Sequence, residues 1–320
     1  MQATPGLWRR TPPAIFPPIF GLLALGLAWR RAVPVFDVPA AVGEAILGAV
    51  TLLFLFAALA YGAKAVRRPA VVAEDLRILP GRAGLSTMML SLYLLAAVLV
   101  PYGGGAATAV LYAGLAAHAG LVVLILYVLA TGPAEQRVVT PVFHLSFVGF
   151  IVAAVPAVPL GLHGLAQAIL WGTGALAIAI WAESLRQFTL RGVPAPLRPL
   201  LAIHLAPVAL LGTVSLMLGQ GGLATGLAWA AVALLLLLAI RVRWLTEAGF
   251  SPFWGAFTFP LAATAGLMAL MAGYVAAQPF RLIAAGALVA ATLVVPPIAW
   301  KVMQMWAKGQ LAAKTNAATA

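Results

Sequence analysis

The sequence contains no cysteine, and charged side chains are rare in it. Without cysteine the chain cannot form disulfides, thiolate-ligated iron–sulfur clusters or a thiol nucleophile. Only 8% of the 320 residues are charged and 64% are hydrophobic, whereas soluble domains have about 25% charged and about 45 to 50% apolar residues. We therefore expect a membrane protein without a large soluble domain.

Sequence signals for catalysis, cofactors and nucleic acid are also missing. Neither HExxH nor GxSxG occurs, so two common hydrolase motifs are absent. No basic stripe is interleaved with aromatic residues, which is the pattern typical of nucleic-acid binding. We expect no enzyme activity, no cofactor and no nucleic-acid partner. The alternative is a b-type haem between His144 and His204, the one candidate pair of histidines, which a Soret band would reveal.

Long apolar runs, separated by short loops with Pro, Gly or charge, recur along the chain. A helix needs about 20 mainly apolar residues to cross a bilayer, and the alternation over roughly ten residues that marks a membrane β-barrel is absent. The sequence thus predicts an all-α, polytopic membrane protein with ten transmembrane helices. They are expected at roughly 13 to 29, 41 to 63, 83 to 100, 106 to 130, 141 to 161, 164 to 185, 197 to 218, 223 to 245, 252 to 276 and 280 to 305.

Domain boundaries follow from these runs. We expect a cytoplasmic N-terminal tail at 1–12, a single transmembrane domain at 13–306 and a disordered cytoplasmic tail at 307–320. The first apolar run is broken by prolines and is followed by "RRAVP" instead of a small-residue cleavage site. It is therefore not interpreted as a signal peptide.

Basic residues are distributed unequally between the two sides of this topology. With ten spans, both termini share a side with the loops after helices 2, 4, 6 and 8, and that side holds most lysines and arginines. The other side has only Arg30, Arg31 and Arg281. Because cytoplasmic loops are enriched in Lys and Arg, we expect both termini in the cytoplasm and the chain in a bacterial inner membrane.

Prolines divide the predicted helices into two kinds. Predicted helices 1, 5, 7 and 9 contain internal prolines, whereas among the even helices only the last does, in "VVPPIAW". Broken backbone is tolerated at membrane depth where the freed carbonyls face protein or water instead of lipid. The alternation favours five helical hairpins around a central pore, with odd helices inside and even helices outside. Ordinary tolerance of proline in membrane helices is the alternative.

Three segments resemble a known family. "IFPPIFGLLALGLAW", "IHLAPVALL" and "FWGAFTFPLAATA" are similar to segments of the tellurite-resistance and C4-dicarboxylate transporter family, whose relatives include the slow anion channels of plant guard cells. The resemblance extends in order over essentially all ten helices. It implies a homotrimer in which each protomer has its own pore, lined by the odd helices and blocked by a phenylalanine. That gate falls on Phe259, the helix 7 kink on Pro207 and the helix 1 kink on Pro17 and Pro18.

The third and fifth predicted helices depart from the family pattern. Where relatives have mid-membrane prolines, this chain has Leu90 and Ser146, so the pattern leaves the pore shape undefined there. His144 and His204 lie in two predicted pore helices, and protonation of a lumen-facing histidine would add positive charge to an anion pathway. Neutral histidines hydrogen-bonded to neighbouring helices are the alternative. No acidic residue lies at the centre of an odd helix, which argues against a cation pathway.

The segment "FTFP" predicts how the pore would close. Pro260 deprives the carbonyl of Ala256 of its amide partner and bends the helix, so the turn carrying Phe259 can lean toward the axis. An apolar constriction blocks ions because they would have to shed water. Alternatively, Phe257 and Phe259 are packing residues beside a tolerated kink. We retain Phe257 as a further pore-lining candidate.

An arginine precedes every odd helix on its cytoplasmic side. If these helix starts surround one pore, the arginines and the positive helix N-termini would concentrate anions at its inner mouth. A topology signal without a role in conduction is the alternative. The arginines are Arg9 with Arg10, Arg82, Arg137, Arg198 and Arg243.

These observations together predict a passive channel for small monovalent anions such as chloride or nitrate. The alternative is a secondary carrier or efflux protein for C4-dicarboxylate, tellurite or sulfite. Coupled carriers usually keep a buried carboxylate or histidine for the proton, or unwound inverted repeats, and only the histidines are available here. The expected partners are small anions, membrane lipid and, as the resemblance implies, two further copies of the chain. Small residues in helices 2 and 6 suit a helix-packed interface between copies, and packing within the protomer is the alternative.

Overall fold

The computed structural model describes residues 8–274 and 278–320, and this part of the chain is helical, without strands. Nine helical spans of the described residues are long and apolar enough to cross a membrane, and three of these spans include a preceding 3₁₀ turn. The all-α, polytopic class is thereby confirmed. The helices are α1 (Phe16–Phe36), α2 (Ala40–Arg67), α4 (Leu79–Leu99), α5 (Gly104–Thr131), α7 (His163–Leu190), α8 (Leu205–Met217), α9 (Gly221–Ile240), α11 (Gly255–Tyr274) and α12 (Gln278–Ala307).

Shorter helical turns precede three of these helices. The 3₁₀ segments η1 (Pro13–Ile15), η4 (Ala195–His204) and η5 (Pro252–Trp254) lead into α1, α8 and α11. Each has proline at its first or second position, where the missing amide proton is not needed. Proline therefore shapes the starts of these spans.

The predicted helix at 141–161 is not continuous. It consists of η3 (His144–Val148), which is a π-helix, followed by α6 (Ile151–Ala157), which contains Pro156. A π turn holds an extra residue and Pro156 cannot donate to the preceding turn, so the backbone here departs from a regular α-helix. Ser146 stands where relatives have a proline. The segment is nevertheless not a straight helix, because Ser146 lies inside the π-helix.

Burial separates the spans into two groups. The apolar cores of the spans that end in α1, α4, α8 and α11 are 56 to 78% buried, whereas those of α2, α5, α7, α9 and α12 are only 17 to 39% buried. The second group exposes large apolar side chains such as Leu52, Ile178 and Ile240. Lipid tails can cover such surfaces, so the second group forms the outer layer and the first group the interior.

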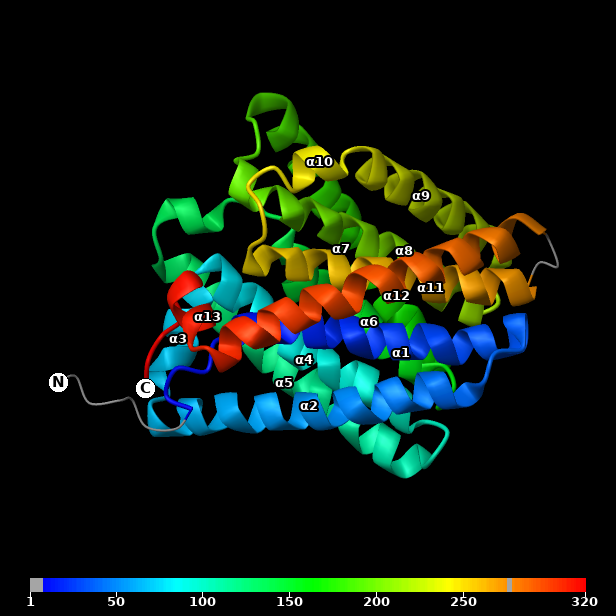
Figure 1. Cartoon of the computed structure of the whole chain (residues 1–320), viewed down its shortest axis with the longest axis horizontal. Helices are drawn as coiled ribbons and strands as arrows, with labels where there is room; N and C mark the ends of the chain where they lie inside the picture. The colour runs from blue at the N-terminus through cyan, green and yellow to red at the C-terminus, as the bar shows by residue number, and fades with distance from the viewer. Residues whose placement is uncertain (1–7, 275–277) are drawn as a thin grey trace.

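The helices α1 and α11 lie side by side through the middle of the molecule and run in the same direction (Figure 1). Gly21 of α1 allows this close approach, because a Cβ there would lie 2.2 Å from the hydroxyl oxygen of Thr258. Later along both helices, Ala28 lies beside Gly266. The two helices therefore stay in contact over several turns.

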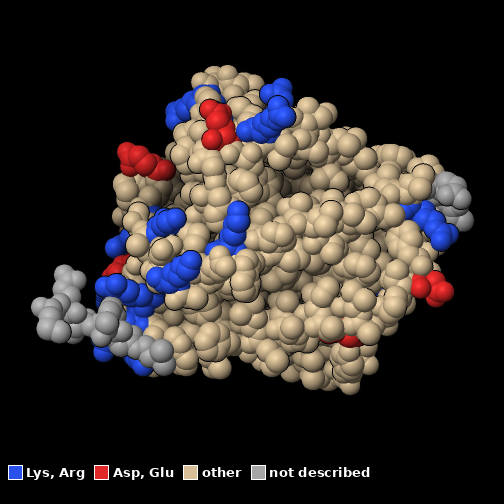
Figure 2. Space-filling model, in the orientation of Figure 1, with Lys and Arg blue, Asp and Glu red and all other residues tan. Residues whose placement is uncertain are grey.

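The first described residues and the C-terminus lie at the same end of the molecule, beside α3 (Ala70–Arg77) and α13 (Gln310–Lys314) (Figure 1). Figure 2 shows many lysines and arginines at this end and around α10 (Val242–Leu245), and a smaller basic group at the opposite end. Of the predicted N-terminal tail 1–12, residues 1–7 lie outside the described residues.

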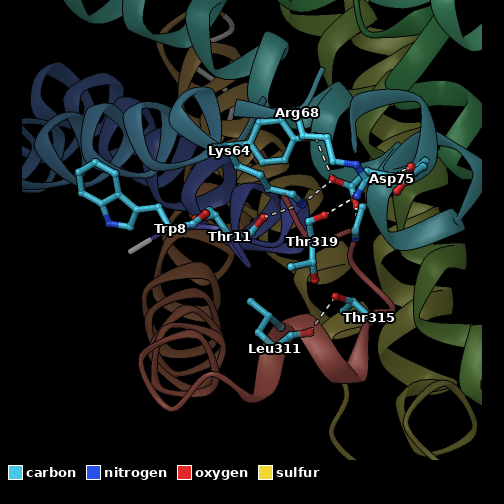
Figure 3. Close-up of polar contacts among 11 residues, drawn as sticks. Trp8, Thr11, Lys64, Arg68, Asp75, Leu311, Thr315 and Thr319 are labelled. Carbon is cyan, nitrogen blue, oxygen red and sulfur yellow. Dashed lines mark hydrogen bonds and ion pairs between the residues drawn. The ribbon is translucent and has the colours of Figure 1, made fainter. Parts of the chain in front are cut away.

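The prediction of a disordered tail at 307–320 is wrong, because these residues fold back onto the protein. Leu311 in α13 is fully buried. The amide of Ala318 donates to Asp75 at 2.8 Å, and Arg68 donates to the carbonyl of Thr319 (Figure 3). Asp75 also pairs with Lys64 at 2.8 Å, with both side chains shielded from solvent. The backbone of the tail is thus tied to α2 and α3.

Candidate functional site

Phe259 lies in the first half of α11, directly before Pro260. Its side chain is 5% exposed, and its ring stacks on that of Phe20 with centroids 3.8 Å apart and planes 14° apart. The hydroxyl of Thr258 donates to the carbonyls of Gly255 at 2.7 Å and Pro17 at 3.2 Å. The turn that carries Phe259 is therefore held against α1.

A cavity of about 40 Å³ lies on one side of Phe259. Its wall is formed by residues of η1, α1, α4, η3, η4, α8, η5 and α11, and we refer to it as the first cavity. It is lined by Ala14, Pro17, Phe20, Pro80, Ala83, Thr87, Leu145, Leu200, Ile203, Ala206, Pro252, Phe253, Gly255, Ala256, Phe259 and Pro260.

A second cavity, of about 10 Å³, follows along the same helices. Along α4, Thr87 lines the first cavity and Leu90, three residues later, lines the second. Along α8, Ala206 lines both cavities and the next residue, Pro207, lines only the second. The two cavities are thus successive levels of one path. The second is lined by Leu90, His144, Leu145, Val148, Gly149, Ile151, Val152, Ile203, Ala206, Pro207, Leu210 and Phe259.

Four residues line both cavities and form the boundary between them: Leu145, Ile203, Ala206 and Phe259. All four side chains are apolar, and no Asp, Glu, Lys or Arg lines either cavity. An apolar constriction of this kind opposes ion passage by dehydration, without a charged plug. Of these four residues, only Phe259 was a candidate from the sequence.

The predicted kink and pore-lining residues fall into two sets. Pro17 and Pro260 line the first cavity, and Leu90, His144 and Pro207 line the second. Pro18 instead packs beside Gly255.

Ser146, Phe257 and His204 line neither cavity, so the structure does not place these three predicted pore-lining residues on the path. The π turn directs the hydroxyl of Ser146 toward Ser86, with the two oxygens 2.9 Å apart. Phe257 packs edge-on against Trp254 on the other side of the α11 turn. Phe257 is therefore the packing residue of the "FTFP" pair.

His144 and His204 come together, as the haem alternative requires, but they contact each other directly. Nε2 of His144 lies 3.0 Å from Nδ1 of His204. Metal–nitrogen bonds are about 2.0 Å long, so an iron held between these two atoms would need a larger gap. The arrangement fits a hydrogen bond between neutral imidazoles and does not fit a haem site. Nδ1 of His144 has no hydrogen-bond partner among the described residues.

The arginines that precede the odd helices are largely used in contacts with the protein. Arg82 is buried and donates to a backbone carbonyl of α3. Arg137 donates to three carbonyls at the end of α5. Arg198 pairs with Glu247 and lies 4.5 Å from the centre of a tryptophan ring. Arg243 is exposed. These contacts hold the helix starts, so attraction of anions would be an additional role.

Comparison with known families decides the general identity of the chain. The family model described as voltage-dependent anion channel matches residues 10–302. The chain belongs to this family. A search of curated proteins finds no match. The resemblance stated from the three proline-containing and aromatic segments is thus confirmed. This member of the voltage-dependent anion channel family is a multi-pass membrane protein, and its general function is anion transport.

Proposed function

We propose that this protein is a passive channel for small monovalent anions such as chloride or nitrate, and that Phe259 closes its pore. The observation that carries the proposal is the position of Phe259, stacked on Phe20 between two cavities that follow one another along the interior helices. A carboxylate would repel anions, and neither cavity is lined by one. The apolar walls would let anions pass once the constriction widens.

The proposed architecture has ten transmembrane segments in five hairpins, with η3 and α6 as the fifth interior segment. The buried shares of the other spans support this arrangement, as does the contribution of all five interior segments to the first cavity. We further propose a bacterial inner membrane location with cytoplasmic termini, because basic residues gather at the end of the molecule where the C-terminus lies. We also propose that the protein is a homotrimer. The proposed activity is transport without catalysis, cofactor or nucleic acid.

A secondary carrier for C4-dicarboxylate, tellurite or sulfite is the second candidate. It is favoured by one observation: His144 lines the second cavity and is hydrogen-bonded to His204, so a titratable pair borders the path. Such a pair could carry the proton of a coupled transporter.

Reconstitution of the purified full-length chain in planar bilayers tests the two candidates against each other. The channel proposal predicts ohmic single-channel steps that reverse at the anion equilibrium potential in the absence of a proton gradient. Flux that saturates, shows no unitary steps and requires a proton gradient would contradict it and support the carrier. Chloride, nitrate and malate in turn would identify the permeant class.

A further inference from the structure

Arg31 differs from the other shielded basic residues of this protein. Among residues 8–274 and 278–320, six Lys or Arg residues are buried or half-buried: Arg30, Arg31, Lys64, Arg68, Arg82 and Arg198. Five of them bond to a carboxylate or a backbone carbonyl. For Arg31 the described residues supply no hydrogen bond, ion pair or aromatic ring. An uncompensated charge within a membrane span is costly and usually functional.

The carboxylate of Glu44, at the same end of the molecule, is engaged by Arg30. Glu44 accepts two hydrogen bonds of 2.7 Å from the guanidinium of Arg30, one on each oxygen. It also accepts one from the hydroxyl of Tyr102, and this bond raises the pKa of Tyr102 above its ordinary value. Arg30 is therefore neutralised, and the positive charges left at this end of α1 are those of Arg31 and of Arg281, which lies over the ring of Phe36.

Arg31 lies on the face of α1 that also carries Phe20, whose ring stacks on Phe259. Arg31 follows Phe20 by eleven residues, which is close to three helical turns, so both lie on the same face of α1 about 16 Å apart. Across the helix pair, Gly266 follows Phe259 by seven residues, or about two turns. The guanidinium of Arg31 lies over Gly266: its Nη1 atom is 2.9 Å from the position that a Cβ atom would take if residue 266 had a side chain. The contact between Arg31 and Gly266 thus continues the line of the Phe20–Phe259 stack.

We propose that Arg31 is an anion-binding site at the outer end of the pathway, where its guanidinium holds the permeating anion. This inference rests on the proposed channel function and deepens it. A guanidinium presents N–H donors in a planar fork that matches two oxygens of one anion. The site would therefore favour a small oxyanion such as nitrate over a halide.

The experiment compares Arg31→Gln and Arg31→Lys in the full-length chain, recorded in a Phe259→Ala background so that the pathway is open. Arg281→Gln is the matched control, because Arg281 belongs to the same basic group but is exposed on the outer helix α12. At about 10 mM external nitrate, we expect Arg31→Gln to lower the current roughly three- to tenfold, with a smaller loss near 1 M. The nitrate-to-chloride permeability ratio should fall in both Arg31 variants and stay unchanged in the control.

An unchanged permeability ratio and an unchanged nitrate current in folded Arg31→Gln would overturn the site. So would equal losses in Arg31→Gln and Arg281→Gln, which would indicate surface charge alone. If Arg31→Gln lowers the thermal stability of the protein but leaves the nitrate-to-chloride permeability ratio unchanged, Arg31 has a structural role and the proposal is contradicted.

A binding measurement keeps this inference separate from channel activity. Nitrate should raise the unfolding temperature of the purified parent and not that of Arg31→Gln, since a ligand of the folded state stabilises it. If Phe259→Ala carries no anion current but this difference is found, the channel proposal fails and the site stands. If nitrate shifts both proteins equally or neither of them, the site is wrong.

Discussion

The buried pair of Lys64 and Asp75 is the most consequential polar contact of the described chain. The two side chains have no exposed surface, and Asp75 also accepts from the hydroxyl of Tyr61 at 2.9 Å and from the amide of Ala318. Lys64 in turn donates to the carbonyl of Thr11 at 3.1 Å. One carboxylate thus joins α2, α3 and both terminal segments.

Substitution of Asp75 by Asn should destabilise the protein strongly. It leaves the buried ammonium of Lys64 without its counter-charge, which typically costs about 3 to 5 kcal/mol. Thermal unfolding in detergent measures the effect. Glu183→Gln is the control, because it breaks an exposed pair with Arg186 worth at most about 1 kcal/mol. Equal unfolding temperatures for the two variants would contradict the assigned role of Asp75.

At the scale of single residues, the sequence predicted the constriction only in part. Phe259 could be found because proline inside an apolar helix is unusual and an aromatic residue precedes it. Leu145, Ile203 and Ala206 could not, because every face of these helices is apolar and periodicity therefore does not tell a lumen from a packing face. Ser146 was misplaced because a π turn changes the direction of side chains that regular helical spacing would predict.

At the scale of elements, proline content predicted most of the interior helices. It missed α4, which has no proline beyond Pro80 in its first turn, yet is among the most buried spans. It also did not reveal that the segment at 141–161 is broken, since that break depends on the contacts of η3 with α4 and α7. Lipid and protein interior are equally apolar, so burial in a membrane protein cannot be read from hydropathy alone.

The C-terminal helix α13 is the element whose order the composition concealed. Leu311 is fully buried although the surrounding segment is polar. Replacing it with Ala should cost about 2 to 5 kcal/mol of the free energy of unfolding and make the tail sensitive to protease. Lys314→Ala, at an exposed position of the same helix, should change neither. Protease resistance that is unaffected by Leu311→Ala would show that α13 does not dock as described.

At the scale of the whole molecule, the exposed glycines bear on the proposed homotrimer. A Cβ added at Gly48 or Gly62 of α2, or at Gly172 of α7, would meet no atom within 4 Å. These small residues therefore do not serve packing within the protomer, and small residues on exposed helix faces are typical of contacts between membrane helices. Native mass measurement in mild detergent should yield three copies of the 33.0-kDa chain. A monomer or a dimer would count against the trimer.

The central claim is that Phe259 closes an anion pathway, and its most direct test compares Phe259→Ala with Phe257→Ala by bilayer recording and folded yield. Phe259 faces two cavities, whereas Phe257 packs against Trp254. The account predicts that Phe259→Ala folds and raises anion current sharply, because the apolar barrier to hydrated ions is removed. It predicts that Phe257→Ala, which removes the contact of a half-buried ring with Trp254, brings no gain in current. A Phe259→Ala protein that folds normally and conducts no better than the parent would contradict the account.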